Sequence, residues 1–227
     1  MAALKIEFDD KYYKSSDEIG DRTKEFIKAL ATNVFEASDA YRADGEIALP
    51  LLTDNEKHKY STFAVAIDKI THTHYSEYAP NEGVNRTVDF WCRVEDRYDY
   101  YIELKAGSYN TGDGTADKPM KWVGSRIEEV IKQLKDIKKP GLVETEVRVG
   151  AVVINGFYHP SKRYDEDSLE GLKRYIAVHY AQEVTDMLIA TWYLPDDLKK
   201  IIANDIGTEG AWYMNKFEWS TIVFFVV

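Results

Sequence analysis

The chain is poor in cysteine and has no long apolar run. Its single cysteine, Cys92, rules out an intramolecular disulfide and argues against a cysteine-based zinc site. No stretch comes near the roughly 20 apolar residues of a membrane-spanning helix. Residues 1–10 also lack the apolar segment of a secretory signal. We therefore expect no membrane partner and a cytoplasmic location.

Basic residues are scarce relative to acidic ones. The chain has 29 Lys and Arg residues against 39 Asp and Glu residues, which gives a net charge of −10. This balance argues against a protein that coats nucleic acid non-specifically, because neutralising phosphates takes Lys and Arg. It suits the binding of divalent cations or of a basic partner. It leaves room for a nucleic-acid enzyme with a local basic patch.

The remaining composition is that of an ordinary globular chain, with 44% hydrophobic and 30% charged residues. No repeat or Pro/Gly linker divides it, so we expect a single domain over residues 1–227. Apolar spacing predicts helices at about 16–44, 54–70, 120–139 and 168–182, and strands at 1–8, 146–156, 186–194 and 219–227. Residues 107–119 read as a loop, and residues 70–78 fit either a helix end or a strand. The order predicts an α/β fold with a mixed central β-sheet flanked by helices.

The stretch VDFWCRVEDRYDYYIELKAG, residues 88–107, predicts a β-hairpin. Alternation places Val88, Phe90, Cys92 and Val94 on one face of the first strand, with Cys92 as a core residue. A three-residue turn, 95–97, sets Val94 opposite Tyr98. The same register sets Asp89 opposite Glu103, with Lys105 two positions further on the same face. A turn of two or four residues would break this pairing.

Two acids opposite each other destabilise a sheet, so this pair needs a compensating cation. Lys105 can compensate in part, and a divalent cation between Asp89 and Glu103 can do so fully. Magnesium prefers oxygen ligands and keeps several waters, so two carboxylates and a nearby carbonyl suffice. Such an ion polarises a phosphoryl oxygen and activates a bound water. The alternative is a wet polar strand face without chemistry.

The arrangement of Asp89 followed by Glu103-Leu104-Lys105 on the next strand resembles the PD-(D/E)XK nuclease superfamily. The predicted order of elements from about residue 17 to 157 agrees with the restriction-endonuclease-like core of that superfamily. The resemblance implies a nuclease using Mg²⁺ or Mn²⁺, with Asp89 and Glu103 as metal ligands and Lys105 as the catalytic lysine. Val88 stands where many members have proline, which is a departure from the motif.

Many members of this superfamily also use an acid upstream of the hairpin. Glu77 is the first choice here, because it precedes the hairpin as such acids often do. Glu82, Glu56 and Glu36 are alternatives. Glu56 falls on the apolar stripe of its predicted helix and Glu36 on the polar side, so helix geometry favours Glu56 of those two.

The expected partner is nucleic acid, DNA before RNA. Residues 118–139 carry seven basic and three acidic residues, a basic strip that suits phosphate contact, although a solvated helix face has the same pattern. Tyr98, Tyr100 and Tyr101 are candidates for base stacking. The alternative function is a non-catalytic binding or scaffold protein with the same fold, whose acidic surface meets a protein partner. A homodimer also fits.

Overall fold

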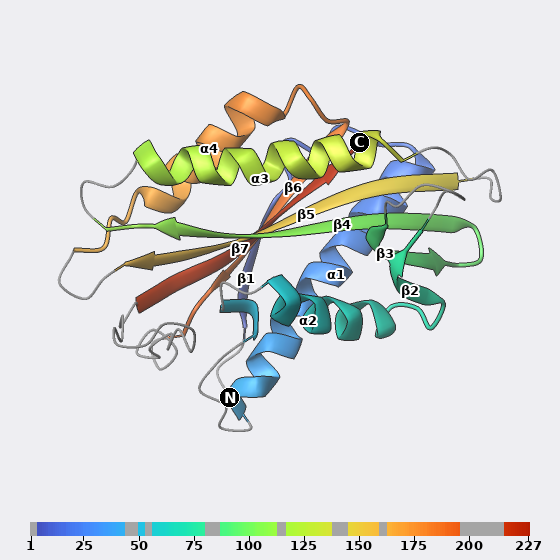
Figure 1. The fold of residues 1–227 in the computed structure, drawn as a ribbon, viewed down its shortest axis with the longest axis horizontal. Helices are drawn as coiled ribbons and strands as arrows, with labels where there is room; N and C mark the ends of the chain where they lie inside the picture. The colour runs from blue at the N-terminus through green and yellow to red at the C-terminus, as the bar shows by residue number, and fades with distance from the viewer. Residues whose placement is uncertain are drawn as a thin grey trace.

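The computed structural model describes residues 4–43, 50–52, 56–79, 87–112, 117–137, 145–158, 163–195 and 216–227. In this part of the chain a seven-stranded mixed sheet lies between two layers of helices (Figure 1). The predicted α/β class is therefore confirmed, and the arrangement agrees with a restriction-endonuclease-like layout. None of the helices described is both long enough and apolar enough to cross a bilayer.

The elements follow the predicted order closely. The helices are α1 (Glu18–Ala43), η1 (Pro50–Leu52), α2 (Glu56–Asp68), α3 (Asp117–Lys135) and α4 (Ser168–Tyr180). The strands are β1 (Lys5–Asp9), β2 (His74–Tyr78), β3 (Val88–Val94), β4 (Tyr98–Asn110), β5 (Thr145–Tyr158), β6 (Asp186–Tyr193) and β7 (Lys216–Val226).

The sheet runs in the order β1-β6-β7-β5-β4-β3-β2. Only β4 and β5 pair in parallel, from Tyr98–Thr145 to Asn110–Phe157, and the other neighbours are antiparallel. A parallel pair needs a crossover between its strands, and α3 is that crossover. The arrangement places α3 directly over β4 and β5, which is where the hairpin acids lie.

The two sheet faces carry separate hydrophobic cores. The helices α1 and α2 cover one face, where Phe26 and Ile27 of α1 and Phe63 of α2 are buried against Ile102 and Leu104 of β4 and other strand residues. The helices α3 and α4 cover the other face (Figure 1). Its core contains the predicted stripe of α3, all of it buried: Val123, Ile127, Val130, Ile131, Leu134 and Ile137. This agreement follows from the 3.6-residue period of the helix.

A glycine brings α3 close to the sheet. A Cβ atom on Gly150 of β5 would lie 2.3 Å from Cγ1 of Val130 and 3.2 Å from Cδ1 of Leu134. Any side chain there would push α3 away, because such a contact is far inside van der Waals distance. Gly150 therefore fixes how closely α3 packs on the sheet beside β4.

The structure changes one sequence assignment and decides between the alternatives of another. The predicted loop at 107–119 is shorter at both ends, because β4 continues to Asn110 and α3 already begins at Asp117. Pairing with β5 as far as Phe157 keeps these glycine-containing residues extended despite their poor strand propensity. The ambiguous residues 70–78 contain a strand, β2, which pairs with β3 at the edge of the sheet.

The hairpin has the predicted register. Val94 pairs with Tyr98 and Phe90 with Ile102, across a turn formed by residues 95–97. Glu95 and Asp96 take left-handed backbone angles, with φ of 53° and 55°. Such angles are typical of tight hairpin turns and reverse the chain within three residues. Cys92 is fully buried, as predicted, and burial raises the pKa of its thiol to about 12.

Candidate active site

The pairing of β3 with β4 ends one residue before the predicted acidic pair. The last paired residues are Phe90 and Ile102, so the register continued by one position sets Asp89 opposite Glu103. There the Oδ2 of Asp89 accepts a hydrogen bond from the backbone N–H of Leu104, at 2.7 Å. In a regular ladder this N–H would serve the facing strand. A side-chain carboxylate therefore replaces a backbone carbonyl, and the two strands separate at Asp89.

Because the strands separate here, one prediction about which sheet face a residue occupies is wrong. Val88 was expected on the same face as Phe90, but Val88 packs in the core under α3 and α4, whereas Phe90 packs under α1 and α2. Strict alternation holds only while the ladder holds. Once Asp89 takes the N–H of Leu104, the preceding residue is free to turn to the other side.

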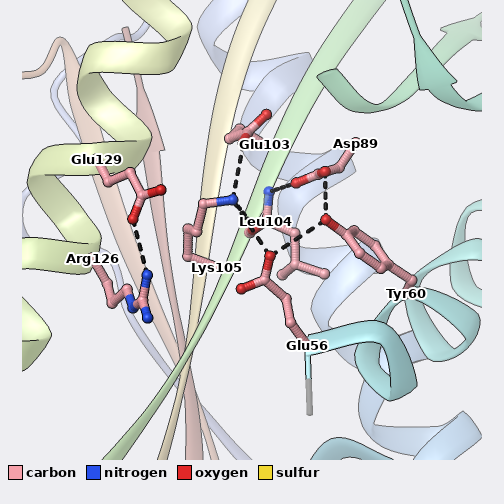
Figure 2. Close-up of polar contacts among 8 residues, drawn as sticks. All are labelled: Glu56, Tyr60, Asp89, Glu103, Leu104, Lys105, Arg126 and Glu129. Atoms are coloured by element: carbon pink, nitrogen blue, oxygen red, sulfur yellow. Dashed lines mark hydrogen bonds and ion pairs between the residues drawn. The ribbon is translucent and has the colours of Figure 1, made fainter. Parts of the chain in front are cut away.

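Past the point where β3 and β4 separate, Lys105 of β4 contacts acids from two layers of the structure. Lys105 shares the α3 face of β4 with Glu103, and its ammonium lies 3.1 Å from Oε1 of Glu103 (Figure 2). The same ammonium lies 3.4 Å from Oε1 of Glu56, the first residue of α2. It also donates to the backbone carbonyl of Leu104, at 3.2 Å. Lys105 therefore joins an acid of the sheet to an acid of the helical layer on the opposite face.

Tyr60 lies one turn along α2 from Glu56 and completes the cluster. Its hydroxyl donates to Oδ1 of Asp89, at 2.5 Å, and lies 3.4 Å from Oε1 of Glu56. Both oxygens of Asp89 are thus engaged, one by Tyr60 and one by the backbone of Leu104 (Figure 2). These two contacts orient the Asp89 carboxylate toward the point where the strands separate.

The cluster carries more acid than one ammonium can compensate. Burial, and then the charge of Asp89, raise the pKa of Glu103 to about 7. Burial also raises the pKa of Asp89, against the hydrogen bonds from Tyr60 and Leu104. For Lys105, burial works to lower the pKa, but the charges of Glu103, Asp89 and Glu56 outweigh it and raise the pKa. The lysine therefore stays charged at neutral pH, and its single positive charge faces the charges of three acids.

Another pair of facing residues in the same hairpin shows how opposed charges are normally arranged. Arg93 faces Asp99, and the guanidinium holds the buried carboxylate with two contacts, at 2.7 Å and 2.9 Å. This pair needs no further cation, because a planar guanidinium matches both carboxylate oxygens. Asp89 and Glu103 lack such a partner opposite them. Their destabilising charge pattern is thus specific to the point where the strands separate.

The candidates for the upstream acid separate clearly. Glu77 lies on the edge strand β2, exposed and with a left-handed φ of 53°, and among the described contacts it makes none with Asp89, Glu103 or Lys105. Glu36 pairs with Lys69 on the surface, at 3.3 Å. Glu82 lies outside the described residues. The structure brings Glu56 into the cluster, and the role of Glu77 stays a prediction.

The remaining sequence candidates lie elsewhere. Tyr98, Tyr100 and Tyr101 are all buried, so their rings are not available to a base, which corrects that prediction. Of the predicted basic strip, Lys121, Lys132 and Lys135 lie exposed along α3, and Arg126 of the same helix is partly buried.

The oxygen donors of the cluster match a hard divalent cation, although they are not yet arranged around one. Asp89, Glu103 and Glu56 supply only carboxylate oxygens, the ligand type that Mg²⁺ and Mn²⁺ prefer. Within the described residues, no three His, Cys, Asp or Glu side chains lie placed to hold one ion as they stand. The oxygens are instead engaged by Tyr60 and Lys105.

Comparison of the chain with protein-family models, curated proteins and solved structures finds no match.

Proposed function

We propose that the protein is a metal-dependent nuclease that hydrolyses phosphodiester bonds, with DNA as the first substrate class to test. One observation carries the proposal: Asp89, Glu103, Glu56 and Lys105 meet where β3 separates from β4. Three acids around one ammonium favour a further cation, and Glu103 with a pKa of about 7 can bind it in place of a proton.

In this proposal Asp89 and Glu103 hold Mg²⁺ or Mn²⁺, and Glu56 replaces Glu77 as the upstream acid. The metal, when bound, polarises a phosphoryl oxygen and favours ionisation of a water. Tyr60 holds Asp89 in position, as the partners of metal ligands commonly do. The backbone N–H of Leu104 has the same effect on the other carboxylate oxygen.

The protonation state of Lys105 defines its part in the reaction. Because its pKa is raised, the side chain is an ammonium at neutral pH and carries no free lone pair. It therefore donates hydrogen bonds to the phosphate and stabilises charge that develops there when water attacks phosphorus and the bond to the leaving oxygen breaks. The proton of the attacking water goes to a carboxylate of the cluster, for which Glu56 is the acid not assigned to the metal.

A cleavage assay with two variants of one hairpin tests the proposal. Wild type, Asp89→Asn and Asp99→Asn are incubated with supercoiled plasmid and with a labelled single strand, in Mg²⁺ or Mn²⁺ and in EDTA. We expect metal-dependent cleavage by wild type and by Asp99→Asn, and a loss of at least about 100-fold in Asp89→Asn. Both variants change one hairpin carboxylate to an amide. A contaminating nuclease would therefore give similar cleavage in the two preparations.

Metal binding gives a second readout that does not depend on cleavage. Mg²⁺ at about 100 times its dissociation constant stabilises the folded state by about 2.7 kcal/mol. We expect the melting temperature of wild type and of Asp99→Asn to rise by several degrees with Mg²⁺, and that of Asp89→Asn to stay constant. A wild-type protein without any cleavage and without this rise would contradict the nuclease proposal and favour the non-catalytic binding protein.

A further inference from the structure

One tryptophan near the cluster is exposed to solvent. Trp122 on α3 exposes 39% of its surface, whereas Trp91, Trp192 and Trp219, the other tryptophans in the described residues, are buried. Tryptophan offers a large flat ring, and a ring exposed next to a candidate site is accessible to a ligand there.

The ring of Trp122 lies against β4, close to Lys105. A Cβ atom on Gly107 would be only 2.7 Å from Cζ3 of Trp122 and 3.3 Å from Cη2. Gly107 follows Lys105 by two residues on the same strand, so both lie on the α3 face, with Cα atoms about 7 Å apart. Only glycine leaves space for the ring in this position. Trp122 is therefore held on the same face of β4 as Lys105, against the next residue along the strand on that face.

Arg126 follows Trp122 by one turn along α3. Its guanidinium carbon lies 5.5 Å from the centre of the Trp122 ring, and an ion pair with Glu129, at 3.0 Å, holds it there. Figure 2 shows Arg126 and Glu129 projecting from α3 on the side of β4 that carries Lys105. A cation over an aromatic ring restrains the ring in one orientation. Contacts with Gly107 and Arg126 thus hold the ring in one orientation, so its surface is rigid.

We propose that Trp122 is a stacking surface for an unpaired nucleobase adjacent to the phosphate that Lys105 contacts. Every base has a flat face that can stack on indole, so such contacts are independent of sequence. A base inside a duplex already stacks on both neighbours and cannot stack on a protein ring without leaving the helix. The inference rests on the proposed nuclease function and sharpens it: single strands, or strand ends that fray, are the preferred substrate class.

A binding experiment tests the stacking without relying on catalysis. A short fluorescein-labelled single-stranded DNA and a duplex closed by hairpins at both ends are titrated with protein, in Ca²⁺ in place of Mg²⁺ to keep the DNA intact. We expect wild type to bind the single strand more tightly than the closed duplex. Trp122→Ala should weaken single-strand binding by about 5- to 150-fold and leave duplex binding unchanged.

Three variants separate stacking from a general change in the surface. Trp122→Phe keeps a flat ring and should retain most of the single-strand preference. Gly107→Ala keeps the tryptophan but displaces its ring, so it should weaken single-strand binding as well. Tyr75→Ala removes the other large exposed aromatic of the described residues, on β2, and should have no effect. Equal losses in Trp122→Ala and Tyr75→Ala, or an unchanged preference in Trp122→Ala, would overturn the inference.

The two proposals fail in distinguishable ways. If wild type cleaves DNA with metal but Trp122→Ala keeps the single-strand preference, only the stacking role is wrong. If wild type binds single strands through Trp122 without cleaving any DNA, only the nuclease function is wrong. If wild type neither binds nor cleaves, both are wrong.

Discussion

Two buried lysines of this protein have nearly the same set of partners. Lys105 lies between Glu103 and Glu56, with Tyr60 beside them. On the far part of the sheet Lys173 of α4 lies 3.2 Å from Glu7 and 2.9 Å from Glu170, and Tyr193 donates to Glu7 at 2.9 Å.

The two clusters differ in the exposure of their acids. Around Lys173 the side chains of Glu7 and Glu170 are 51% and 62% exposed, so water solvates the charge that the lysine does not compensate. Around Lys105 the side chain of Glu103 is only 4% exposed, and Asp89 adds a further, partly buried carboxylate.

The pKa values of the carboxyl groups reflect this difference in exposure. For Glu7, burial works to raise the pKa, but the hydrogen bonds from Tyr193 and Lys173 outweigh it, and the pKa falls below its ordinary value. For Glu103, burial and Asp89 prevail over Lys105 and raise the pKa to about 7. A lysine with two acids is therefore not a functional signal by itself. Buried acids that outnumber the available cations are such a signal.

The largest expected contrast is in cleavage. Lys105→Met should lower kcat/KM for oligonucleotide cleavage by at least about 100-fold, because the phosphate loses its ammonium donor. Lys173→Met removes an equally buried lysine and should leave kcat/KM within about twofold of wild type. The measurement is metal-dependent cleavage at neutral pH, with circular dichroism to show that both variants fold. Similar losses in the two variants would assign the effect to stability and remove Lys105 from the mechanism.

The second contrast is in the pH dependence of stability without metal. Glu103 has a folded-state pKa of about 7 against an ordinary value of 4.5. As pH rises between these values the unfolded chain loses its proton first, so the folded state becomes less stable. Glu103→Gln removes this cost. The difference in unfolding free energy between the variant and wild type should therefore grow in favour of the variant by about 2–3 kcal/mol from pH 5 to pH 8.

Denaturant unfolding at the two pH values measures this gain, and Glu170→Gln is the matched control. Its carboxylate is exposed beside the other lysine, so it should show no comparable gain. A Glu103→Gln variant whose stability follows that of wild type at both pH values would show that Glu103 is ionised and compensated, against the reasoning for a cation site.

The smallest contrast concerns the two tyrosines. Tyr60→Phe removes the hydroxyl that orients Asp89 and should raise the Mg²⁺ concentration for half-maximal cleavage by about tenfold, with little change in kcat at saturating metal. Tyr193→Phe removes the equivalent hydroxyl beside Glu7 and should change neither value. A fall in kcat without any change in the metal requirement would give Tyr60 a direct part in the reaction instead of a positioning one.

Local rules account for much of what the sequence predicted correctly. A three-residue turn sets the register of β3 against β4, and helical periodicity sets the buried stripe of α3. Both patterns involve residues close together in the chain, so neighbouring side chains determine them. The same rules missed the turn of Val88 to the other face, because that follows from a hydrogen bond between Asp89 and Leu104.

The sequence by itself determined the α/β class, the register of β3 against β4 up to Phe90 and Ile102, and the place of Lys105 beside Glu103. Only the tertiary structure decided that Glu56 joins this cluster while Lys173 pairs with Glu7 of β1, 166 residues earlier in the chain. Only the packing of α3 on the sheet placed Trp122 against Gly107, on the face of β4 that carries Lys105. The physical reason is that burial and long-range contacts set the electrostatic balance of a site, and no local pattern in the chain encodes how many charges meet there.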